Sequence, residues 1–265
     1  AALAAGGWDA ADLDLLLVAT CTPDMPLPST ACLIQRNLKA SRAIAFDLAA
    51  ACSGFLYGLS VADLYVRSGT CRKALVVGTE VMSSVIDWTD RSTCILFGDG
   101  AGAVLIEPSD DDRGILSTHL HSDGDLWDLV CVPGGGSRLP ASAAMLADRQ
   151  QFVKMKGNET FKVAVRTLEA TAREALEANK MGVADVDLFI PHQANVRIVN
   201  AVMERLGLRK DRVFLNIDRY GNTSAASIPL ALDEAVRAGR ISPGSRILMV
   251  AFGSGLTWAS AVVKW

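Results

Sequence analysis

Residues 49–55 read Ala-Ala-Ala-Cys-Ser-Gly-Phe and lie between a short apolar segment, 42–48, and a helical pattern that runs to about Ser68. A strand that turns sharply into a helix leaves free N–H groups and the positive end of the helix dipole at the first helical residues. A cysteine there is expected to have a lowered pKa and to act as a nucleophile near neutral pH. A lone cysteine is also commonly a buried core thiol, so both interpretations of Cys52 stand at this point.

The chain repeats one α/β pattern. Residues 12–17 (DLDLLL) resemble residues 185–190 (DVDLFI), each an apolar strand that follows an acidic turn. The spacing from Cys52 to Gly69 equals that from Asn222 to Gly239, and each of these glycines precedes an apolar strand. Two copies of one βαβ-rich unit predict two sheets packed with pseudo-symmetry, with the starts of two helices meeting between them. Unrelated α/β segments that look alike are the alternative.

The expected organisation has three parts. Residues 1–107 form the first half, truncated at its start; residues 108–150, polar and rich in Gly and Pro in places, form a connection with few core residues; and residues 151–265 form the second half. Residues 97–102 (FGDGAG) lack the GxxxxGK[ST] pattern, so they are interpreted as a turn that feeds a strand rather than as a phosphate loop.

Composition limits the classes of function. The chain has 26 basic and 29 acidic residues, a balance that provides no overall field for nucleic acid or membrane surfaces. No run reaches about 18 apolar residues, so no transmembrane helix is expected. The six cysteines include no CxxC pair, which argues against a metal site or a disulfide scaffold and is typical of a cytoplasmic protein. The chain starts at Ala1, within what reads as the end of a helix, so a preceding segment is expected.

Two further polar residues follow apolar segments of the second half. His192 comes directly after the strand at 188–190, and carboxyl ends of parallel strands are where ligands bind. Asn222 stands at the start of a helix, at the position that the repeat equates with Cys52. Each has a structural interpretation, as a satisfied histidine or a helix cap. Together the three suit one reaction, because a cysteine can carry an acyl group as a thioester while an imidazole and an amide donate hydrogen bonds to an enolate oxygen.

Four motifs then occur in order: AACSGF at 50–55, PHQAN at 191–195, GNTSAAS at 221–227 and FGSGLTW at 252–258. With DRSTCILFGDGAG, which starts at Asp90, and MKGNETFKVAV, which starts at Met155, they resemble β-ketoacyl-acyl carrier protein synthase III over the whole chain. The resemblance implies a thiolase-like α/β fold of two pseudo-symmetric halves in αβαβα layers. Members of that family carry about sixty further residues before the position of Ala1, and without them we expect the first sheet to lack a central strand.

The resemblance also implies an activity: an acyltransferase that joins an acyl-CoA primer to malonyl-acyl carrier protein and so initiates fatty acid synthesis. Cys52 takes the acyl group, and His192 and Asn222 stabilise the enolate formed by decarboxylation. The backbone N–H groups of Cys52 and of the turn at Ser254, where relatives carry glycine, hold the primer oxyanion. Acyl-CoA and malonyl-acyl carrier protein are substrates, and no cofactor or metal is expected.

The binding residues follow from the same resemblance. CoA and its pantetheine arm are assigned to Arg91, Asn195 and Gly157, and carrier-protein docking to Arg197, Lys162 and Arg205, part of a basic cluster that continues through Arg209, Lys210 and Arg212. Leu27 matches a position that reaches into the acyl pocket of a partner subunit, which implies a homodimer; a leucine there leaves the length of the primer open.

Other enzymes and one non-enzyme remain as alternatives. Elongating condensing enzymes use a second histidine in place of Asn222, and thiolases use a cysteine in the turn that holds Ser254. Polyketide-type and quinolone-forming synthases share Cys-His-Asn and are the main rival. No motif places the extra glutamate of a hydroxymethylglutaryl-CoA synthase or a head-to-head synthase. A non-catalytic acyl-binding partner subunit usually lacks the nucleophile, whereas this chain has Cys52.

Overall fold

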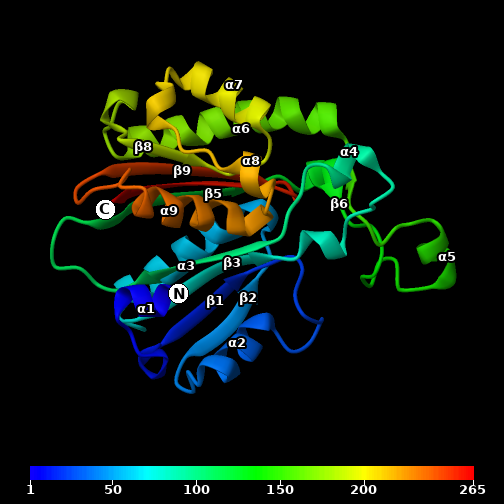
Figure 1. Ribbon diagram of the computed structural model, residues 1–265, viewed down its shortest axis with the longest axis horizontal. Helices are drawn as coiled ribbons and strands as arrows, with labels where there is room; N and C mark the ends of the chain where they lie inside the picture. The colour runs from blue at the N-terminus through cyan, green and yellow to red at the C-terminus, as the bar shows by residue number, and fades with distance from the viewer.

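The computed structural model describes residues 1–265 and contains two four-stranded mixed sheets (Figure 1). The first has the order β2-β1-β3-β4, from β1 (Leu15–Ala19), β2 (Ile44–Leu48), β3 (Ala74–Glu80) and β4 (Gly100–Ile106). The second has the order β5-β10-β9-β8, from β5 (Gly114–Ser122), β8 (Leu188–Pro191), β9 (Arg246–Gly253) and β10 (Thr257–Lys264). In each sheet, two strands that pair in parallel are followed by an antiparallel one: β1 and β3 by β4, and β8 and β9 by β10.

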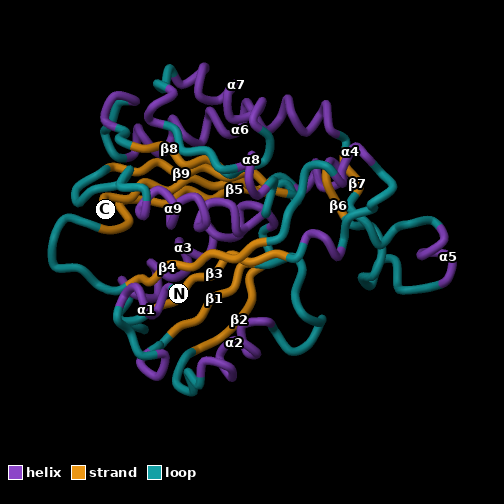
Figure 2. The backbone as a smooth tube through the Cα atoms, in the orientation of Figure 1, coloured by secondary structure: helices purple, strands orange, loops and turns teal.

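Helices cover both sheets and fill the space between them (Figures 1 and 2). Between the sheets lie α3 (Gly54–Arg67) and α9 (Ser227–Arg237), whose apolar residues share one core with both sheets. Outside the first sheet lie α1 (Ala2–Gly6) and α2 (Thr30–Leu38), and outside the second lie α6 (Gly157–Ala178) and α7 (Val196–Leu206). This αβαβα arrangement confirms the predicted fold class.

The apolar run of the first predicted strand is buried on both faces. All five residues of β1 are buried. Leu15 and Leu17 pack into the core between the sheets, whereas Leu16 and Val18 pack against the outer helices. A strand with helices on both sides has no polar face, which explains a continuous rather than an alternating apolar pattern.

The two halves meet where the inner helices begin. Short 3₁₀ helices precede both, η2 (Ala51–Ser53) before α3 and η7 (Ser224–Ala226) before α9, and the two lie against each other. Gly78 in β3 allows this approach, because a Cβ atom there would lie 2.3 Å from the carbonyl oxygen of Ala225. The carboxyl ends of β1, β3, β8 and β9 therefore open toward a common centre, where ligands bind in open α/β sheets.

Residues 108–150 contain a strand of the second sheet that sequence inspection missed. Strand β5 pairs antiparallel with β10 along its length. Its sequence, GILSTHLHS, mixes apolar residues with a run of polar ones and is mostly only partly buried, so it lacks the long apolar run that marks the inner strands. The same stretch holds η4 (Gly124–Leu129), β6 (Val130–Cys131) and α5 (Ala143–Ala147), which projects from the body in Figure 1, and β6 pairs with β7 (Lys154–Met155).

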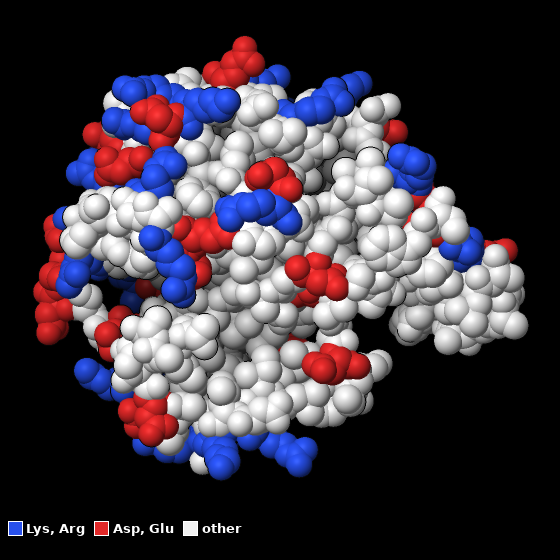
Figure 3. Space-filling view, viewed as in Figure 1, with Lys and Arg blue, Asp and Glu red and all other residues white.

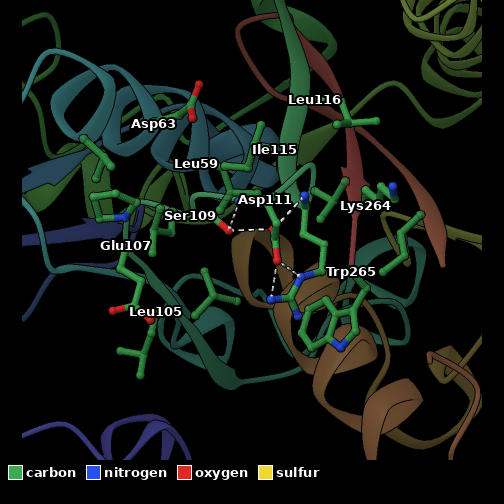
Figure 4. Close-up of a pocket in the computed structure, with 18 of the residues that line it drawn as sticks. Leu59, Asp63, Leu105, Glu107, Ser109, Asp111, Ile115, Leu116, Lys264 and Trp265 are labelled. Carbon is green, nitrogen blue, oxygen red and sulfur yellow. Dashed lines mark hydrogen bonds and ion pairs between the residues drawn. The ribbon is translucent and has the colours of Figure 1, made fainter. Parts of the chain in front are cut away.

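The expectation that the first sheet lacks a central strand is wrong. Its four strands are paired without a gap. In the second sheet, β5 lies beside the antiparallel strand β10; in the first sheet, no strand lies at the corresponding outer edge of β4. Beside that edge is a hollow of about 970 Å³, lined by Leu59, Ile106, Ile115 and Trp265 among others (Figure 4). None of the predicted site residues lines it.

The remaining elements are short. They are α4 (Arg91–Cys94), α8 (Ile217–Tyr220), and the 3₁₀ helices η1 (Ala10–Asp12), η3 (Met82–Ser84), η5 (Val183–Asp185) and η6 (Lys210–Arg212). The stretch read as a glycine-containing turn does feed a strand, β4. None of the helices is both long and apolar enough to span a membrane.

Candidate active site

Cys52 lies in η2, directly before α3, on a turn that is held from both halves of the chain. Ala51 has a left-handed backbone conformation with φ of 46°, which is uncommon for a residue with a side chain. The hydroxyl of Ser53 donates to the carbonyl of Thr257 at 3.1 Å, and the hydroxyl of Thr257 donates to the carbonyl of Ala50 at 2.9 Å. These contacts fix the turn that presents the partly exposed Cys52 side chain.

The prediction of a lowered pKa for Cys52 is wrong. Burial raises the pKa of its thiol to about 11, and the nearby Glu80 carboxylate acts in the same direction. A hydrogen bond from Ser224 opposes the rise without cancelling it. Since the helix start alone does not give a thiolate at neutral pH, the thiol proton needs an acceptor during the reaction.

The predicted equivalence of Cys52 and Asn222 also needs a correction. The two 3₁₀ helices begin at Ala51 and Ser224, with φ of 46° and 49°, so local geometry pairs Cys52 with Ala225. The equal spacing from Cys52 to Gly69 and from Asn222 to Gly239 does not reflect equivalent elements, because α3 has 14 residues and α9 has 11. Asn222 lies just before its turn instead of within it.

His192 follows β8 and is 2% exposed. Its Nδ1 atom lies 2.6 Å from the hydroxyl oxygen of Ser227, which also accepts the backbone N–H of Gln193 at 3.4 Å. The serine hydroxyl can therefore donate to Nδ1, and with that orientation the ring proton lies on Nε2. Burial lowers the pKa of His192 to about 3, so the imidazole is neutral and Nε2–H is a hydrogen-bond donor.

Asn222 is held in one orientation. Its side-chain oxygen accepts the backbone N–H of Ser224 at 2.9 Å, and its own backbone N–H donates to Leu96 at 2.8 Å. The backbone N–H of Gly98 donates to the carbonyl of Asn222 at 3.0 Å. Because the amide oxygen is used internally, the NH₂ group is the end available to a ligand.

Cys52, His192 and Asn222 line one cavity of about 960 Å³ between the halves. The same cavity is lined by five further residues predicted from the resemblance, namely Gly157, Lys162, Asn195, Arg197 and Ser254. Apolar residues including Met82, Val85, Phe161 and Ile198 form much of the remaining wall. A mostly apolar cavity with a few convergent polar groups is the usual form of a small-molecule site.

The turn that holds Ser254 lies beside the nucleophile. The preceding residue, Gly253, is so close that a Cβ atom on it would lie 2.8 Å from the backbone nitrogen of Cys52. The Ser254 hydroxyl donates to the carbonyl of Val130 on β6, so this side chain is tied to the segment that links the two halves. A serine is therefore accommodated without pointing at Cys52.

Two of the three predicted CoA residues, Asn195 and Gly157, line the cavity, and Arg91 does not. Asn195 lines the cavity, and its side-chain oxygen accepts the backbone N–H of Arg197 at 2.9 Å, which caps α7. Gly157 begins α6 and also lines the cavity. Arg91 begins α4 and is exposed; it is not among the lining residues, although Ser92 of the same helix is.

The predicted docking residues divide into two groups. Lys162 and Arg197 are exposed at the cavity, and the Arg197 guanidinium lies 5.6 Å from the ring centroid of Phe161. Arg205 lies farther along α7, away from the cavity lining, and pairs with Glu169 at 3.1 Å. Basic side chains gather over α6 and α7 with acidic ones among them (Figure 3).

Leu27 lies in the loop between β1 and α2 and is 84% exposed. It does not line the cavity of its own chain.

Sequence inspection missed three residues around the nucleophile: Ser227, Ser224 and Glu80. Both serines lie inside the GNTSAAS motif, and Glu80 ends the apolar strand β3 of the first sheet. The rule that polar residues at the carboxyl ends of parallel strands form sites would have found Glu80. No group of three or more His, Cys, Asp or Glu side chains is arranged to hold a metal ion.

Comparison with known proteins gives the family. The sequence model described as 3-oxoacyl-[acyl-carrier-protein] synthase III matches residues 46–124, and that of its C-terminal part matches residues 176–265. The β-ketoacyl-[acyl-carrier-protein] synthase III of Roseiflexus castenholzii is 54% identical over 265 residues, all of this chain and 80% of the relative. That of Thioalkalivibrio sulfidiphilus is 52% identical over 264 residues, with 81% of the relative covered.

Solved structures agree with this assignment. The 3-oxoacyl-[acyl-carrier-protein] synthase III of Aquifex aeolicus superposes with a TM-score of 0.91 at 47% identity, covering 99% of this chain and 80% of that one. The priming β-ketosynthase of the R1128 polyketide pathway gives 0.91 at 39%, covering 99% and 78%. Xanthomonas campestris OleA, at 0.84 and 22% identity, shares the fold. Matches of this identity and coverage mean that the chain belongs to the 3-oxoacyl-[acyl-carrier-protein] synthase III family.

Proposed function

We propose that this chain is an acyltransferase that condenses an acyl-CoA primer with malonyl-acyl carrier protein, releases CO₂, and gives the β-ketoacyl carrier protein that initiates fatty acid synthesis. The observation that carries the proposal is the meeting of Cys52, His192 and Asn222 in one largely apolar cavity, each held by contacts that leave its reactive group to the cavity. Membership of the synthase III family supports the same activity.

In the first half-reaction the Cys52 sulfur attacks the thioester carbonyl of the primer. The oxygen of the tetrahedral intermediate is stabilised by the backbone N–H of Cys52 and by a backbone N–H of the turn at residues 253–255. The close approach of Gly253 to the Cys52 nitrogen supports this role, since it brings the two stretches of backbone together. CoA leaves and the primer remains as a thioester on Cys52.

In the second half-reaction the malonyl thioester carbonyl accepts hydrogen bonds from His192 Nε2–H and the Asn222 amide. Loss of CO₂ leaves the electron pair of the broken C–C bond as an enolate, whose oxygen these two donors stabilise. The enolate carbon then attacks the Cys52 thioester, and the sulfur leaves. A neutral imidazole suits this work, because burial keeps the pKa of His192 far below neutrality and the ring acts as a fixed donor.

The substrates reach the cavity from the face of α6 and α7. The pantetheine arm passes Asn195 and Gly157, with Arg91 beyond them at the adenine, and Arg197 and Lys162 receive the acidic carrier protein with Arg205 farther out. Leu27, apolar and 84% exposed, completes the acyl pocket of a second subunit in a homodimer. The reaction uses no cofactor, and the enzyme works in the cytoplasm.

The second candidate is a priming synthase of a polyketide pathway. Its support is the 39% identity and TM-score of 0.91 to the priming β-ketosynthase of the R1128 pathway. The two candidates share the chemistry at Cys52 and differ in the primer and in the carrier protein.

The test is a condensation assay with purified protein, an acyl-CoA panel, and malonyl groups loaded on carrier proteins of fatty acid or polyketide synthesis. Mass spectrometry of the carrier reports the product. We expect a β-ketoacyl carrier protein whose chain is two carbons longer than the primer. Turnover on the polyketide carrier alone would favour the second candidate, and no product on either would contradict both.

A further inference from the structure

A buried serine hydroxyl lies behind the imidazole of His192. Ser227 is the first residue of α9 and is 2% exposed, whereas His192 follows β8 of the second sheet. The Ser227 hydroxyl oxygen lies 2.6 Å from His192 Nδ1 and accepts the backbone N–H of Gln193 at 3.4 Å, and the side chain makes no other hydrogen bond. A hydroxyl removed from water is costly unless its proton has an acceptor. Nδ1 is the one acceptor that the structure offers to this proton.

Two arrangements of protons are conceivable at this contact, and they differ in how well the buried groups are satisfied. With a proton on Nδ1, the ring and the Gln193 N–H would both donate to the Ser227 oxygen, and the serine proton would have no acceptor. With the serine proton donated to Nδ1, each of these groups has a partner. Burial keeps the ring neutral, with a pKa lowered to about 3, so it carries a single N–H, which the second arrangement leaves on Nε2.

The backbone of His192 is fixed independently of its ring. Its N–H donates to the carbonyl of Val250 at 2.7 Å, and its carbonyl accepts the N–H of Ala194 at 3.0 Å. Neither bond restrains rotation of the imidazole about its side-chain torsions. The contact with Ser227 is the only hydrogen bond of the ring within the protein. This one hydroxyl therefore determines both which nitrogen carries the proton and which nitrogen is left for a ligand of the cavity that His192 lines.

Asn222, the other donor of the site, is held in a different way. Its side-chain oxygen accepts a backbone N–H, that of Ser224, at 2.9 Å. A change of the Ser224 side chain does not remove that donor. The orientation of His192, in contrast, depends on a side-chain hydroxyl, so a single substitution can release the imidazole while the donor to Asn222 stays in place.

We propose that Ser227 is a positioning residue for malonyl decarboxylation, whose hydroxyl holds the His192 ring with Nε2–H directed at the malonyl thioester oxygen. The inference rests on the proposed function. Ser227 is not among the residues that line the cavity, so it acts through His192 and does not touch the substrate. No proton is transferred in the step. The C–C bond to the carboxylate breaks, CO₂ leaves, and the electron pair moves into the enolate, whose oxygen accepts the hydrogen bond of a ring that stays neutral.

The first test reads the ring protons directly in the protein without substrate. The chain has three histidines, so nitrogen-15 histidine labelling gives few signals, and His192→Gln identifies those of His192. Long-range proton–nitrogen correlation spectra at neutral pH separate a protonated from an unprotonated ring nitrogen. We expect His192 to show a protonated Nε2 and an unprotonated Nδ1, and Ser227→Ala to show a mixture of the two tautomers. A protonated Nδ1 in wild type, or an unchanged single tautomer in Ser227→Ala, would overturn the proposal.

The second test compares the two half-reactions. Ser227→Ala should slow malonyl decarboxylation without primer by about 10- to 100-fold, the range found when an outer partner of a metal-bound histidine is removed. Acylation of Cys52 by acyl-CoA should match wild type, because that step does not use His192. Ser227→Thr keeps a hydroxyl and should restore most of the decarboxylation. The matched control is Ser60→Ala, which removes another buried serine hydroxyl, one that contacts Thr118 and lies outside the cavity.

The outcomes separate positioning from a general loss of structure. Decarboxylation by Ser227→Ala at the wild-type rate, or an equal loss of decarboxylation and acylation, would overturn the positioning role. If Ser227→Ala fails to fold, the wild-type spectrum and the rate of Ser227→Thr decide the question. A wild-type protein that neither decarboxylates malonyl carrier protein nor accepts an acyl group would overturn the proposed function instead, and its spectrum would still report where the proton of His192 lies.

Discussion

Gly253 offers the sharpest steric test of the site. It is the last residue of β9, and it lies so close to the backbone around Cys52 that there is no room for a side chain. A Cβ atom there would lie 2.8 Å from the Cys52 nitrogen, 3.1 Å from the Ser53 nitrogen and 3.2 Å from the Ala50 oxygen. All three are backbone atoms, so no side-chain rotation relieves the overlap. Ordinary contact begins near 3.4 Å, so Gly253→Ala must move the two stretches apart by about 0.6 Å.

This displacement should lower both stability and activity. Overpacking of this kind costs about 1–3 kcal/mol, and for a chain of this size each kcal/mol lowers Tm by about 2–4 °C. A shift toward 1 Å in a catalytic group reduces rates by about 10²-fold, and here the shifted groups are the nucleophile and an oxyanion donor. We expect the acylation rate of Cys52 to fall by about that factor.

The assay is stopped-flow or quenched acylation by acyl-CoA together with thermal unfolding. The matched control is Gly136→Ala, since a Cβ atom on Gly136 meets nothing within 4 Å and its backbone is not left-handed. The control should match wild type in both measurements. Gly253→Ala with unchanged Tm and unchanged acylation would refute the assignment of this turn to the oxyanion site.

Three other predictions follow from the same geometry. His192→Ala and Asn222→Ala should slow malonyl decarboxylation by about 10²-fold or more while Cys52 is still acylated; loss of acylation in both would make their role structural. Arg197→Glu should raise KM for malonyl carrier protein and not for acyl-CoA, and an equal rise for both would remove the docking assignment. Because burial holds the folded-state pKa of His192 near 3, against about 6.5 unfolded, the free energy of unfolding should decrease as pH falls from about 6.5 toward 3, by up to about 1.4 kcal/mol per unit. Urea titrations at several pH values should show a smaller slope for His192→Gln than for wild type, and equal slopes would contradict the buried neutral imidazole.

From its internal repeat, the sequence predicted two sheets packed with pseudo-symmetry, whereas the αβαβα layers were implied by the resemblance to the synthase III family. The sequence also placed Cys52 at the start of a helix, because an apolar segment turns there into a helical pattern. It did not predict the pKa of that thiol, which depends on the depth of the cavity and on Glu80, a residue 28 positions away in the chain. The residue pattern also hid β5, whose mixture of apolar and polar residues reads as a connection, and it paired Cys52 with Asn222 where the local backbone pairs Cys52 with Ala225.

The contacts around Ser224 and Ser227 show what a linear motif conceals. Both residues stand in GNTSAAS, yet one hydroxyl contacts the imidazole of His192 and the other donates to the Glu80 carboxylate at the end of β3. Ser224 and Glu80 come from different halves of the chain and become neighbours only because the two halves meet where the inner helices begin. The surroundings of the nucleophile are therefore a product of the fold as a whole.

The central claim is that Cys52 takes an acyl group from acyl-CoA. Its most direct test is the intact mass of the protein after incubation with a panel of acyl-CoAs and no malonyl substrate, with Cys52→Ser as the matched control. We expect a mass gain equal to one acyl group for at least one primer, located on Cys52 by peptide mapping and absent from the variant. No adduct with any acyl-CoA, or an adduct that persists in Cys52→Ser, would contradict the account.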